Sequence, residues 1–455
     1  MIVPTRRMLC LGLLGVAAVA LAGTRFLAIE VAALWLLALL VLALADTWFI
    51  PSRATLTWSR SHEPKLSLGA WNPVTLALTN ASGRRLRYEV RDAVPQLLIP
   101  DRDSGSGESL PNSPCTVQYA VYPVHRGDYH FGPISARYMG PLGLVWTQYV
   151  TQTQDDARVY PNLLAVRRYE SLLHRGMLHE IGLRRTRRRG AGTEFERLRE
   201  YTPDDDYRRI NWTATARRHQ PIAVDYTTER AQNIMLLIDA GRLMATQVPY
   251  SGEMEHPEDL GPREVAPALT RLDHVVNAAL LLAFVSQETG DRVGLLAFSD
   301  RVTRFVGAAA GRRQFLALTE VLYDLQPRAT ESDYAAALSY LRVHSPRRSL
   351  AIIFTDIAHE AAATSLLAHV ASLVRRHLPL IVTMRDPAIE AVANRQPDNS
   401  AGVYERAVAR DLLDRRDLVL SRLRAAGALT LDVPADALSP SLINRYLEIK
   451  AAGVL

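Results

Sequence analysis

Two long apolar runs open the chain. Residues 8–22 are apolar throughout, and the run Phe26–Ala45 is interrupted only by Glu30. About twenty helical residues span the ~30 Å hydrocarbon core of a bilayer, so the pattern predicts a transmembrane helical hairpin over residues 1–50. The first run also fits a signal peptide that ends at an A-x-A site, with Ala20 and Ala22 as the small residues, and this alternative stays open.

The distribution of basic residues indicates an orientation for this hairpin. Arg6 and Arg7 precede the first apolar run, and Arg53, Arg60 and Lys65 follow the second. Basic residues next to membrane spans favour the cytoplasmic side. We therefore expect two membrane spans, with the soluble part of the chain in the cytoplasm.

From residue 51 to residue 161, apolar and polar residues alternate. The segments Val74–Leu78, Tyr88–Val90 and Val117–Val121 follow this period of two, which is typical of half-buried strands. Several short strands over about a hundred residues favour an antiparallel sandwich. We expect a β-sandwich-like domain that is either a rigid spacer or a module that binds a partner or a glycan.

Residues 231–455 show short continuous apolar runs that alternate with helical periods. Continuous apolar runs fit strands buried on both faces of a parallel sheet, and their alternation with helices predicts a doubly wound α/β domain. The predicted strands are Ile234–Asp239, Val293–Phe298, Leu350–Asp356, Leu378–Met384 and Ala428–Val433, with Arg301–Val306 as an antiparallel edge strand. The predicted helices are Leu272–Gln287, Gly311–Leu325, Asp333–Val343, Glu360–Arg376 and Val403–Ala425.

The composition and the absent motifs exclude several classes of enzyme. Of the 455 residues, 48% are hydrophobic and 22% are charged, which is typical of folded domains. Two cysteines exclude a disulfide framework. The sequence contains no P-loop, no H-E-x-x-H helix and no G-x-S-x-G elbow. We therefore expect a protein that is not an enzyme, and no small-molecule substrate is indicated.

The charge of the chain points to a membrane surface. The formal net charge is +6, and five arginines occupy the six positions of Arg184–Arg189. No aromatic residue interleaves with this cluster, which disfavours binding to nucleic acid. A basic segment near the bilayer favours contact with anionic lipid headgroups.

A connector over residues 162–230 carries a dense mixture of charged and aromatic residues. Three adjacent carboxylates, Asp204–Asp206, could hold a divalent cation. The preferred interpretation is a clamp of ion pairs between domains, because charges removed from water persist only when they are paired. The candidate residues of this motif are Glu194, Arg199, Asp205, Asp206, Arg208, Trp212 and Arg217.

The segment Gly192–Arg217 resembles the signature of the bacterial domain of unknown function 58 family. The segments Arg126–Pro133, Pro141–Leu144 and Gly290–Phe298 are similar to other parts of that family. The resemblance implies a membrane-anchored protein whose α/β domain is von Willebrand factor A-like. It also implies a protein partner, because such proteins are often encoded beside a MoxR-type AAA+ ATPase.

The same resemblance implies a metal-ion-dependent adhesion site, in which hydroxyl and carboxylate oxygens hold a cation such as Mg²⁺. Carried over residue by residue, the ligands would be Asp239, Ser332 and Asp356. Gly241 and Leu243 stand where the family of sites has serines, which makes a bound Mg²⁺ doubtful. One alternative is that Arg242 replaces the cation with an ion pair; another is that both aspartates cap helices or tie loops.

These observations favour a membrane-tethered, non-enzymatic adaptor or chaperone-like protein that binds a MoxR-type ATPase. One alternative is a metal-assisted hydrolase that uses Asp204–Asp206, or Asp239 with Asp356. Another is an envelope structural protein whose β domain binds a ligand outside the cytoplasm.

Overall fold

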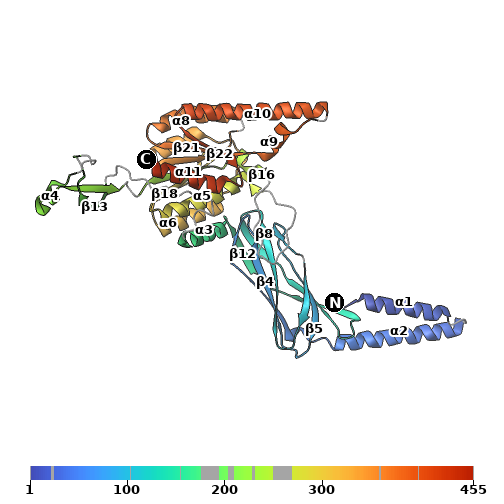
Figure 1. Cartoon of the computed structure of the whole chain (residues 1–455). Coiled ribbons are helices and arrows are strands. Elements are labelled where there is room, and N and C mark those ends of the chain that lie inside the picture. Colours follow the sequence, from blue (N-terminus) through green and yellow to red (C-terminus); the bar gives the residue numbers. More distant parts are fainter. Residues whose placement is uncertain are drawn as a thin grey trace. The chain divides into compact units, whose positions relative to one another are not determined.

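The computed structural model divides the chain into two compact units, one that ends at Tyr160 and one that begins at Pro161 (Figure 1). The described residues are 2–21, 25–102, 104–153, 155–175, 194–202, 207, 210–227, 231–248, 269–357, 360–397 and 399–453.

The first unit contains a β-sandwich. One sheet has the strand order β1-β11-β10-β5-β7, a second has β2-β4-β8-β6, and a short third has β3-β12-β9. The strands are β1 (Ile2–Pro4), β2 (Leu56–His62), β3 (Lys65–Ser67), β4 (Asn72–Asn80), β5 (Leu86–Asp92), β6 (Leu98–Pro100), β7 (Gly105–Ser109), β8 (Pro114–Pro123), β9 (Gly127–Phe131), β10 (Ile134–Met139), β11 (Val145–Thr151) and β12 (Asp155–Tyr160). The predicted β-sandwich-like domain is confirmed.

Alternate residues of these strands form the interior between the sheets. In β4, Val74, Leu76 and Leu78 are each no more than 2% exposed, as their period of two predicts. Aromatic side chains join the two larger sheets: Trp58 of β2 donates its indole N–H to the buried Tyr138 hydroxyl of β10 at 2.7 Å. The Trp58 ring also packs edge-on against Tyr88 of β5.

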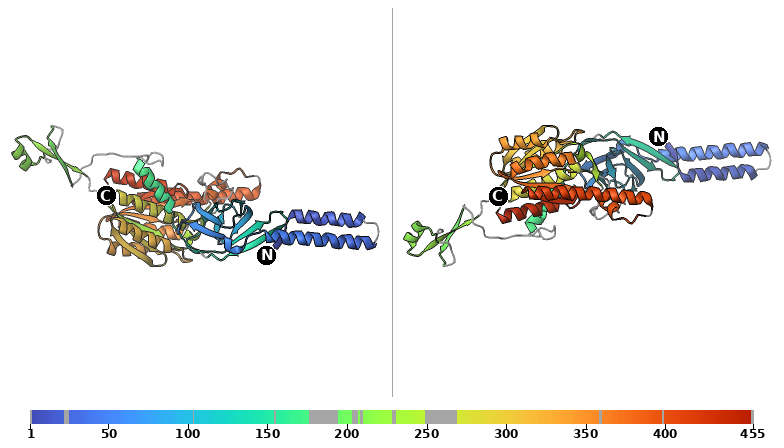
Figure 2. Two further views of the ribbon diagram at one scale, coloured as in Figure 1. Left: turned by 90° about the horizontal axis from the view of Figure 1, so that it is seen from below. Right: turned by 90° about the horizontal axis from the view of Figure 1, so that it is seen from above.

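Two apolar helices, α1 (Arg6–Leu21) and α2 (Arg25–Trp48), lie side by side in the first unit (Figures 1 and 2). The Trp35 indole N–H donates to the Leu11 carbonyl at 3.1 Å. Gly15 permits this approach, because a Cβ there would lie 2.2 Å from the Trp35 ring. The two helices are therefore in direct contact.

The prediction of two membrane spans is wrong, because the structure has one candidate span among the described residues. Among the described residues, only Ala28–Thr55 is long and apolar enough to cross a membrane, with a mean hydropathy of 2.5. The 16 residues of α1 extend over only about 24 Å, short of the ~30 Å hydrocarbon core. The helix α2 is thus a candidate membrane anchor.

Both ends of the helix pair are tied to the β-sandwich through the loop Pro141–Leu144. The buried Asp46 carboxylate, at the end of α2, accepts hydrogen bonds from the backbone N–H groups of Leu142 and Leu144 at 2.8 Å and of Val145 at 3.0 Å. Thr5 donates its hydroxyl to the Gly143 carbonyl at 2.7 Å, and β1 pairs with β11. Cleavage after Ala22 would remove β1 and the Thr5 contacts.

The second unit is built on a six-stranded sheet with the order β19-β18-β15-β20-β21-β22. All neighbours are parallel except the edge pair β18 and β19. The strands are β15 (Asn233–Asp239), β18 (Arg292–Phe298), β19 (Val302–Ala309), β20 (Leu350–Phe354), β21 (Leu378–Arg385) and β22 (Leu429–Pro434). The predicted α/β sheet and its antiparallel edge strand are confirmed.

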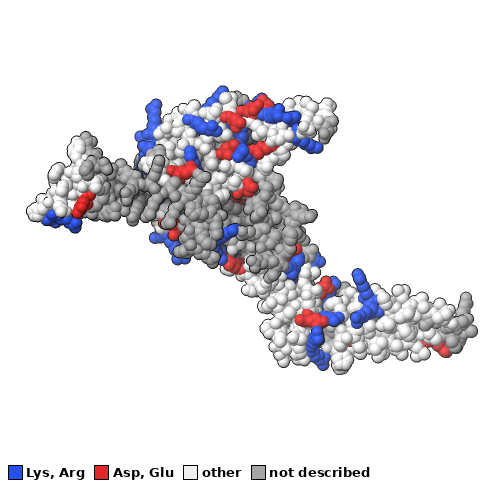
Figure 3. Space-filling model, viewed as in Figure 1, with Lys and Arg blue, Asp and Glu red and all other residues white. Residues whose placement is uncertain are grey.

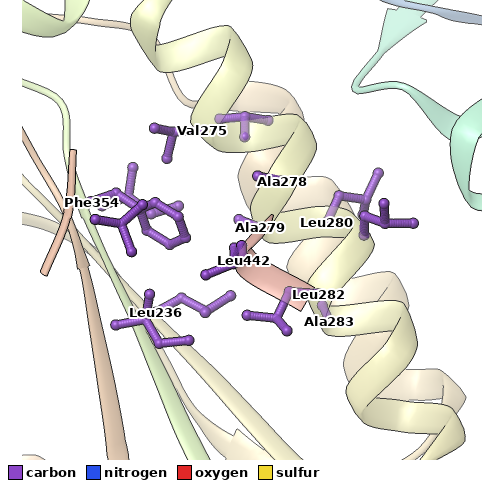
Figure 4. Close-up of a cluster of buried hydrophobic side chains, with 14 of the residues drawn as sticks. Leu236, Val275, Ala278, Ala279, Leu280, Leu282, Ala283, Phe354 and Leu442 are labelled. Carbon is purple, nitrogen blue, oxygen red and sulfur yellow. The ribbon is translucent and has the colours of Figure 1, made fainter. Parts of the chain in front are cut away.

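Helices cover both faces of this sheet. Ile234, Leu236 and Ile238 of β15 pack with α5, α6 and α11, whereas Met235 and Leu237 pack with α7, α8 and α10. Figure 4 shows the first of these clusters, in which Leu236 and Phe354 face Ala279 and Leu282 of α5. Every position of β15 after Asn233 is buried, which explains why its apolar run is continuous.

Four helices of the second unit were not predicted from the sequence: α3, α4, α9 and α11. Tyr169 of α3 packs edge-on against Phe284 of α5, so the first helix of the connector lies on the α/β domain. The helices are α3 (Leu163–Arg175), α4 (Trp212–Arg218), α5 (Arg271–Glu288), α6 (Arg312–Asp324), α7 (Tyr334–His344), α8 (Glu360–Val374), α9 (Pro387–Asn394), α10 (Ser400–Ala425) and α11 (Leu438–Ala452). Two short pairs, β13 (Glu194–Glu200) with β14 (Ile222–Thr227) and β16 (Gln247–Val248) with β17 (Leu269–Thr270), complete the unit.

Candidate functional site

The strand order reverses between β15 and β20, the first and fourth strands of the six-stranded sheet along the chain. Ligands of open α/β sheets bind outside the carboxyl ends of the strands at such a reversal. Asp239 is the last residue of β15, and Asp356 follows β20 by two residues. The structure therefore brings both predicted aspartates to the edge where a site is expected.

Four donors surround the Asp239 carboxylate, which is only 3% exposed. One oxygen accepts from the backbone N–H of Gly241 at 2.8 Å and from the hydroxyl of Ser332. The other lies 3.1 Å from the Tyr334 hydroxyl and 2.8 Å from the Thr355 hydroxyl. The predicted neighbours Asp239 and Ser332 are thus in direct contact.

The Tyr334 and Thr355 hydroxyls are also 2.7 Å from each other. The two hydroxyls supply two protons for three contacts, so a protonated Asp239 would supply the third. Burial raises the pKa of the Asp239 carboxyl, against the opposing effect of its hydrogen bonds. Burial, followed by the nearby Asp239 charge, raises the pKa of Tyr334 as well, which keeps this phenol a hydrogen-bond donor.

Two arginines hold the Asp356 carboxylate. Arg271, the first residue of α5, donates to one oxygen at 2.5 Å, and Arg416 of α10 donates to the other at 3.2 Å. Asp356 is 4% exposed, and the side chains of Arg271 and Arg416 are 7% and 13% exposed. Such buried charges persist because each has a partner of the opposite sign.

The same arginines extend the network along the sheet edge. Arg271 reaches Asp386, the N-cap of α9, at 3.3 Å. Arg416 donates to Asp432 of β22 at 2.7 Å and to the Met384 carbonyl of β21 at 2.9 Å. The chain's own guanidinium groups therefore link the ends of β20, β21 and β22 to α5 and α10.

These residues do not fit a divalent cation. Both Asp356 oxygens bind guanidinium groups, and both Asp239 oxygens accept from donors of the chain. Leu243 carries no ligand atom, and a Cβ on Gly241 would meet the Ser332 hydroxyl oxygen at 2.2 Å. No group of three or more metal-ligating His, Cys, Asp or Glu side chains occurs in the described part of the chain.

The hypothesis that Arg242 pairs with the two aspartates is wrong. The Arg242 side chain is 56% exposed and lies 3.5 Å from Glu331. It stands in the turn after β15, but the guanidinium groups at the sheet edge come from α5 and α10. Proximity in sequence therefore selected the wrong arginine.

The family model described as a protein of unknown function, DUF58, matches residues 197–251 and 263–395. The chain contains a DUF58 domain. The matched residues include Asp239, Ser332 and Asp356 but end before α10, which supplies Arg416. The resemblance inferred from the sequence is thereby confirmed for residues 197–251 and 263–395.

The chain is also similar to proteins whose functions are not described. An uncharacterized protein of Mycobacterium tuberculosis is 25% identical over 200 residues, 44% of this chain and 56% of that protein. The alignment thus spans little more than half of that relative. An uncharacterized membrane-spanning protein from Vibrio fischeri is 14% identical, with 48% of this chain and 98% of that chain covered and a TM-score of 0.18. A CARDB domain from Pyrococcus furiosus is 13% identical, with 23% and 91% covered and a TM-score of 0.16.

The described residues of the signature segment Gly192–Arg217 lie mostly in β13 and α4, and β13 pairs with β14, which follows the segment. Glu194 and Arg199 lie on β13. Trp212, 70% exposed, is the first residue of α4, and Arg217 stands in its last turn. Asp205, Asp206 and Arg208, and the basic cluster 184–189, lie outside the described residues, so the ion-paired clamp stays a prediction.

Several residues of the sheet edge were missed by sequence reasoning. Tyr334 lies two residues after Ser332, and Thr355 directly precedes Asp356. Asp386 is the first residue after β21. An aspartate just after an apolar run was a usable signal for Asp386, whereas Asp432 lies within β22. The arginines gave no comparable signal, because they are 85 and 60 residues from Asp356.

A serine at position 241, as in the adhesion-site pattern, should destabilise the DUF58 domain. We expect Gly241→Ser to lower the free energy of unfolding by about 1–3 kcal/mol, because the added Cβ meets Ser332, the Thr330 carbonyl and Asp239. Thermal unfolding with and without Mg²⁺ measures this. Gly307→Ser is the control, since nothing in the described part of the chain lies within 4 Å of a Cβ there. Stabilisation of Gly241→Ser by Mg²⁺ would contradict our assignment.

Proposed function

We propose that this protein is a membrane-anchored, non-enzymatic adaptor whose DUF58 domain binds a protein partner, a MoxR-type AAA+ ATPase. The observation that carries the proposal is the carboxyl edge of the sheet, where Arg271 and Arg416 occupy both oxygens of Asp356. A carboxylate that pairs with two guanidinium groups is a weak general base and a weak metal ligand, because their positive charges offset its negative charge. The edge therefore supports binding better than hydrolysis.

The sequence indicates which of the two proteins would hydrolyse ATP. The chain contains no P-loop, so ATP hydrolysis belongs to the partner. The adaptor would hold the ATPase near the bilayer, because α2 is a candidate anchor and Asp46 ties its end to the β-sandwich. The pair would then act on membrane or envelope complexes.

The proposed location of both units is the cytoplasmic side of a bacterial inner membrane. Basic side chains gather near the sandwich end of the helices: Arg53 donates to the Val150 carbonyl, and Arg84 donates to the Phe49 carbonyl at 2.8 Å. This distribution supports the location, since basic residues beside a span favour the cytoplasm. A reporter fused after Leu455 that is active only when exported would instead favour an envelope protein.

Purification of the full chain in mild detergent tests the partner. We expect a MoxR-type ATPase to be retained from the native bacterium and to be absent from a bait in which an unrelated protein carries the same residues 1–50. Addition of the purified chain to that ATPase should change its rate of ATP hydrolysis. The proposal fails if the ATPase neither binds the intact chain nor responds to it. Turnover by the isolated chain that Asp356→Ala abolishes would establish an enzyme instead.

A further inference from the structure

A cavity of about 700 Å³ lies beside the arginine network of the DUF58 unit. Its lining includes residues of α8, α9, α10 and the segment that follows β20, Asp356 among them. The charged residues that line it are Arg271, Asp356, Arg385, Asp386, Arg415, Arg416 and Arg422. Five positive and two negative side chains leave the lining with a net positive charge, which suits an anionic group.

Two N–H groups of this lining lack an acceptor. The Nε atoms of Arg271 and Arg385 are buried and have no hydrogen-bond partner within the described residues. Arg385 Nε is 4.0 Å from the nearest Asp432 oxygen, which exceeds the length of a hydrogen bond. Arg271 is only 5% exposed. A buried donor without an acceptor is destabilising, and a ligand oxygen here would satisfy these N–H groups.

Apolar side chains also line the cavity, and some of them reach the exposed surface of α10. Ile389, Leu413 and Val419 line the cavity. Leu412 of α10 also lines it, and its side chain is 44% exposed to solvent. Tyr404 and Val408, 73% and 41% exposed, precede Leu412 at the four-residue spacing that places side chains on one helix face. Figure 3 shows this part of the unit, over α8, α9 and α10, with basic and acidic side chains interspersed.

We propose that this cavity and the apolar face of α10 formed by Tyr404, Val408 and Leu412 bind an acidic segment of a protein partner. A carboxylate of that segment pairs with Arg385 and Arg271, and its aliphatic side chains cover the apolar face. A single carboxylate matches the planar fork of a guanidinium group. Asp356 and Asp386 in the same lining disfavour the higher charge of a phosphate. The inference rests on the proposed function, since it names the chemistry by which the DUF58 domain recognises its partner.

Selection from a display library of random short peptides on the full chain, in detergent micelles, tests this proposal. We expect enrichment of peptides that combine Asp or Glu with aliphatic residues. Arg385→Gln and Leu412→Gln should each weaken their binding about tenfold. Arg304→Gln, on β19, and Leu316→Gln, on α6, are matched controls, because these side chains are similarly exposed but lie outside the cavity.

The results distinguish this docking site from a phosphate site and from a failure of the proposed function. Failure to enrich acidic peptides, or equal binding by Arg385→Gln and wild type, overturns the docking site. Displacement of the peptides by an excess of inorganic phosphate, but not by acetate, also overturns it and assigns the cavity to a phosphate ligand. If acidic peptides bind but no ATPase is retained by the chain, the docking site stands and the proposed ATPase partner fails. If the ATPase is retained equally by Arg385→Gln, the adaptor stands and its interface lies elsewhere.

Discussion

Replacement of Arg60 by Met is expected to lower the free energy of unfolding of the β-sandwich by about 3–5 kcal/mol. The Arg60 side chain is fully buried and forms a two-pronged contact with Asp92, which is itself only 4% exposed. It also donates to Asp155 at 2.8 Å and to the Gly132 carbonyl at 2.7 Å. Methionine retains most of the aliphatic stem, so the effect reports the lost charge and not an empty volume.

The effect is large because the buried Asp92 carboxylate loses its main partner. Without Arg60, the Asp92 carboxylate keeps, among its donors in the described part of the chain, only the Tyr119 hydroxyl, and it remains buried beside β2 and β10. Urea unfolding of the full chain in detergent micelles measures the change. Arg87→Met is the matched control, since Arg87 is 59% exposed and pairs with Glu108 at the surface. An Arg60→Met variant that is no less stable than Arg87→Met would show that Asp92 does not depend on this arginine.

The α/β sheet was predictable because its strands are buried on both faces. Each interior run, such as Ile234–Ile238 or Leu350–Phe354, is apolar at every position, and an ordinary surface segment does not have that composition. The helix α11 was missed although Leu442, Tyr446 and Ile449 follow a helical period. Its Pro440 stands in the first turn, where no N–H group is needed.

The positions of the site were predictable, whereas its partners were not. Asp239 and Asp356 end neighbouring parallel strands, so the sequence places them at one edge of the sheet. Which cation neutralises Asp356 depends on where α5 and α10 cross that edge, and this is a property of tertiary packing. The loop Pro141–Leu144 is similar: a family resemblance marks it, but only the structure shows that it binds Asp46 and Thr5.

Asp239→Ala should lower the free energy of unfolding of the second unit by about 3 kcal/mol, because the Gly241 N–H and three hydroxyls lose a buried acceptor. Asp239→Asn should cost little. Its carbonyl oxygen can accept from Gly241 and Ser332, while its NH₂ group donates to Tyr334 and Thr355. The Tyr334–Thr355 contact of 2.7 Å then receives a proton of its own, so every short contact in the cluster has a donor.

The pH dependence distinguishes the acid from the amide. Burial raises the pKa of Asp239 in the folded chain, so its favourable contribution is complete below the unfolded pKa of about 3.9 and is lost as the pH rises through the folded pKa. The side-chain amide introduced by Asp239→Asn does not titrate, so this variant should escape the loss and match or exceed wild type at neutral pH. Urea unfolding across this pH range measures both variants, with Asp324→Asn as the control at a 64% exposed carboxylate. If Asp239→Asn is instead as unstable as Asp239→Ala at neutral pH, the negative charge itself is required, and a cation at this edge would have to be reconsidered.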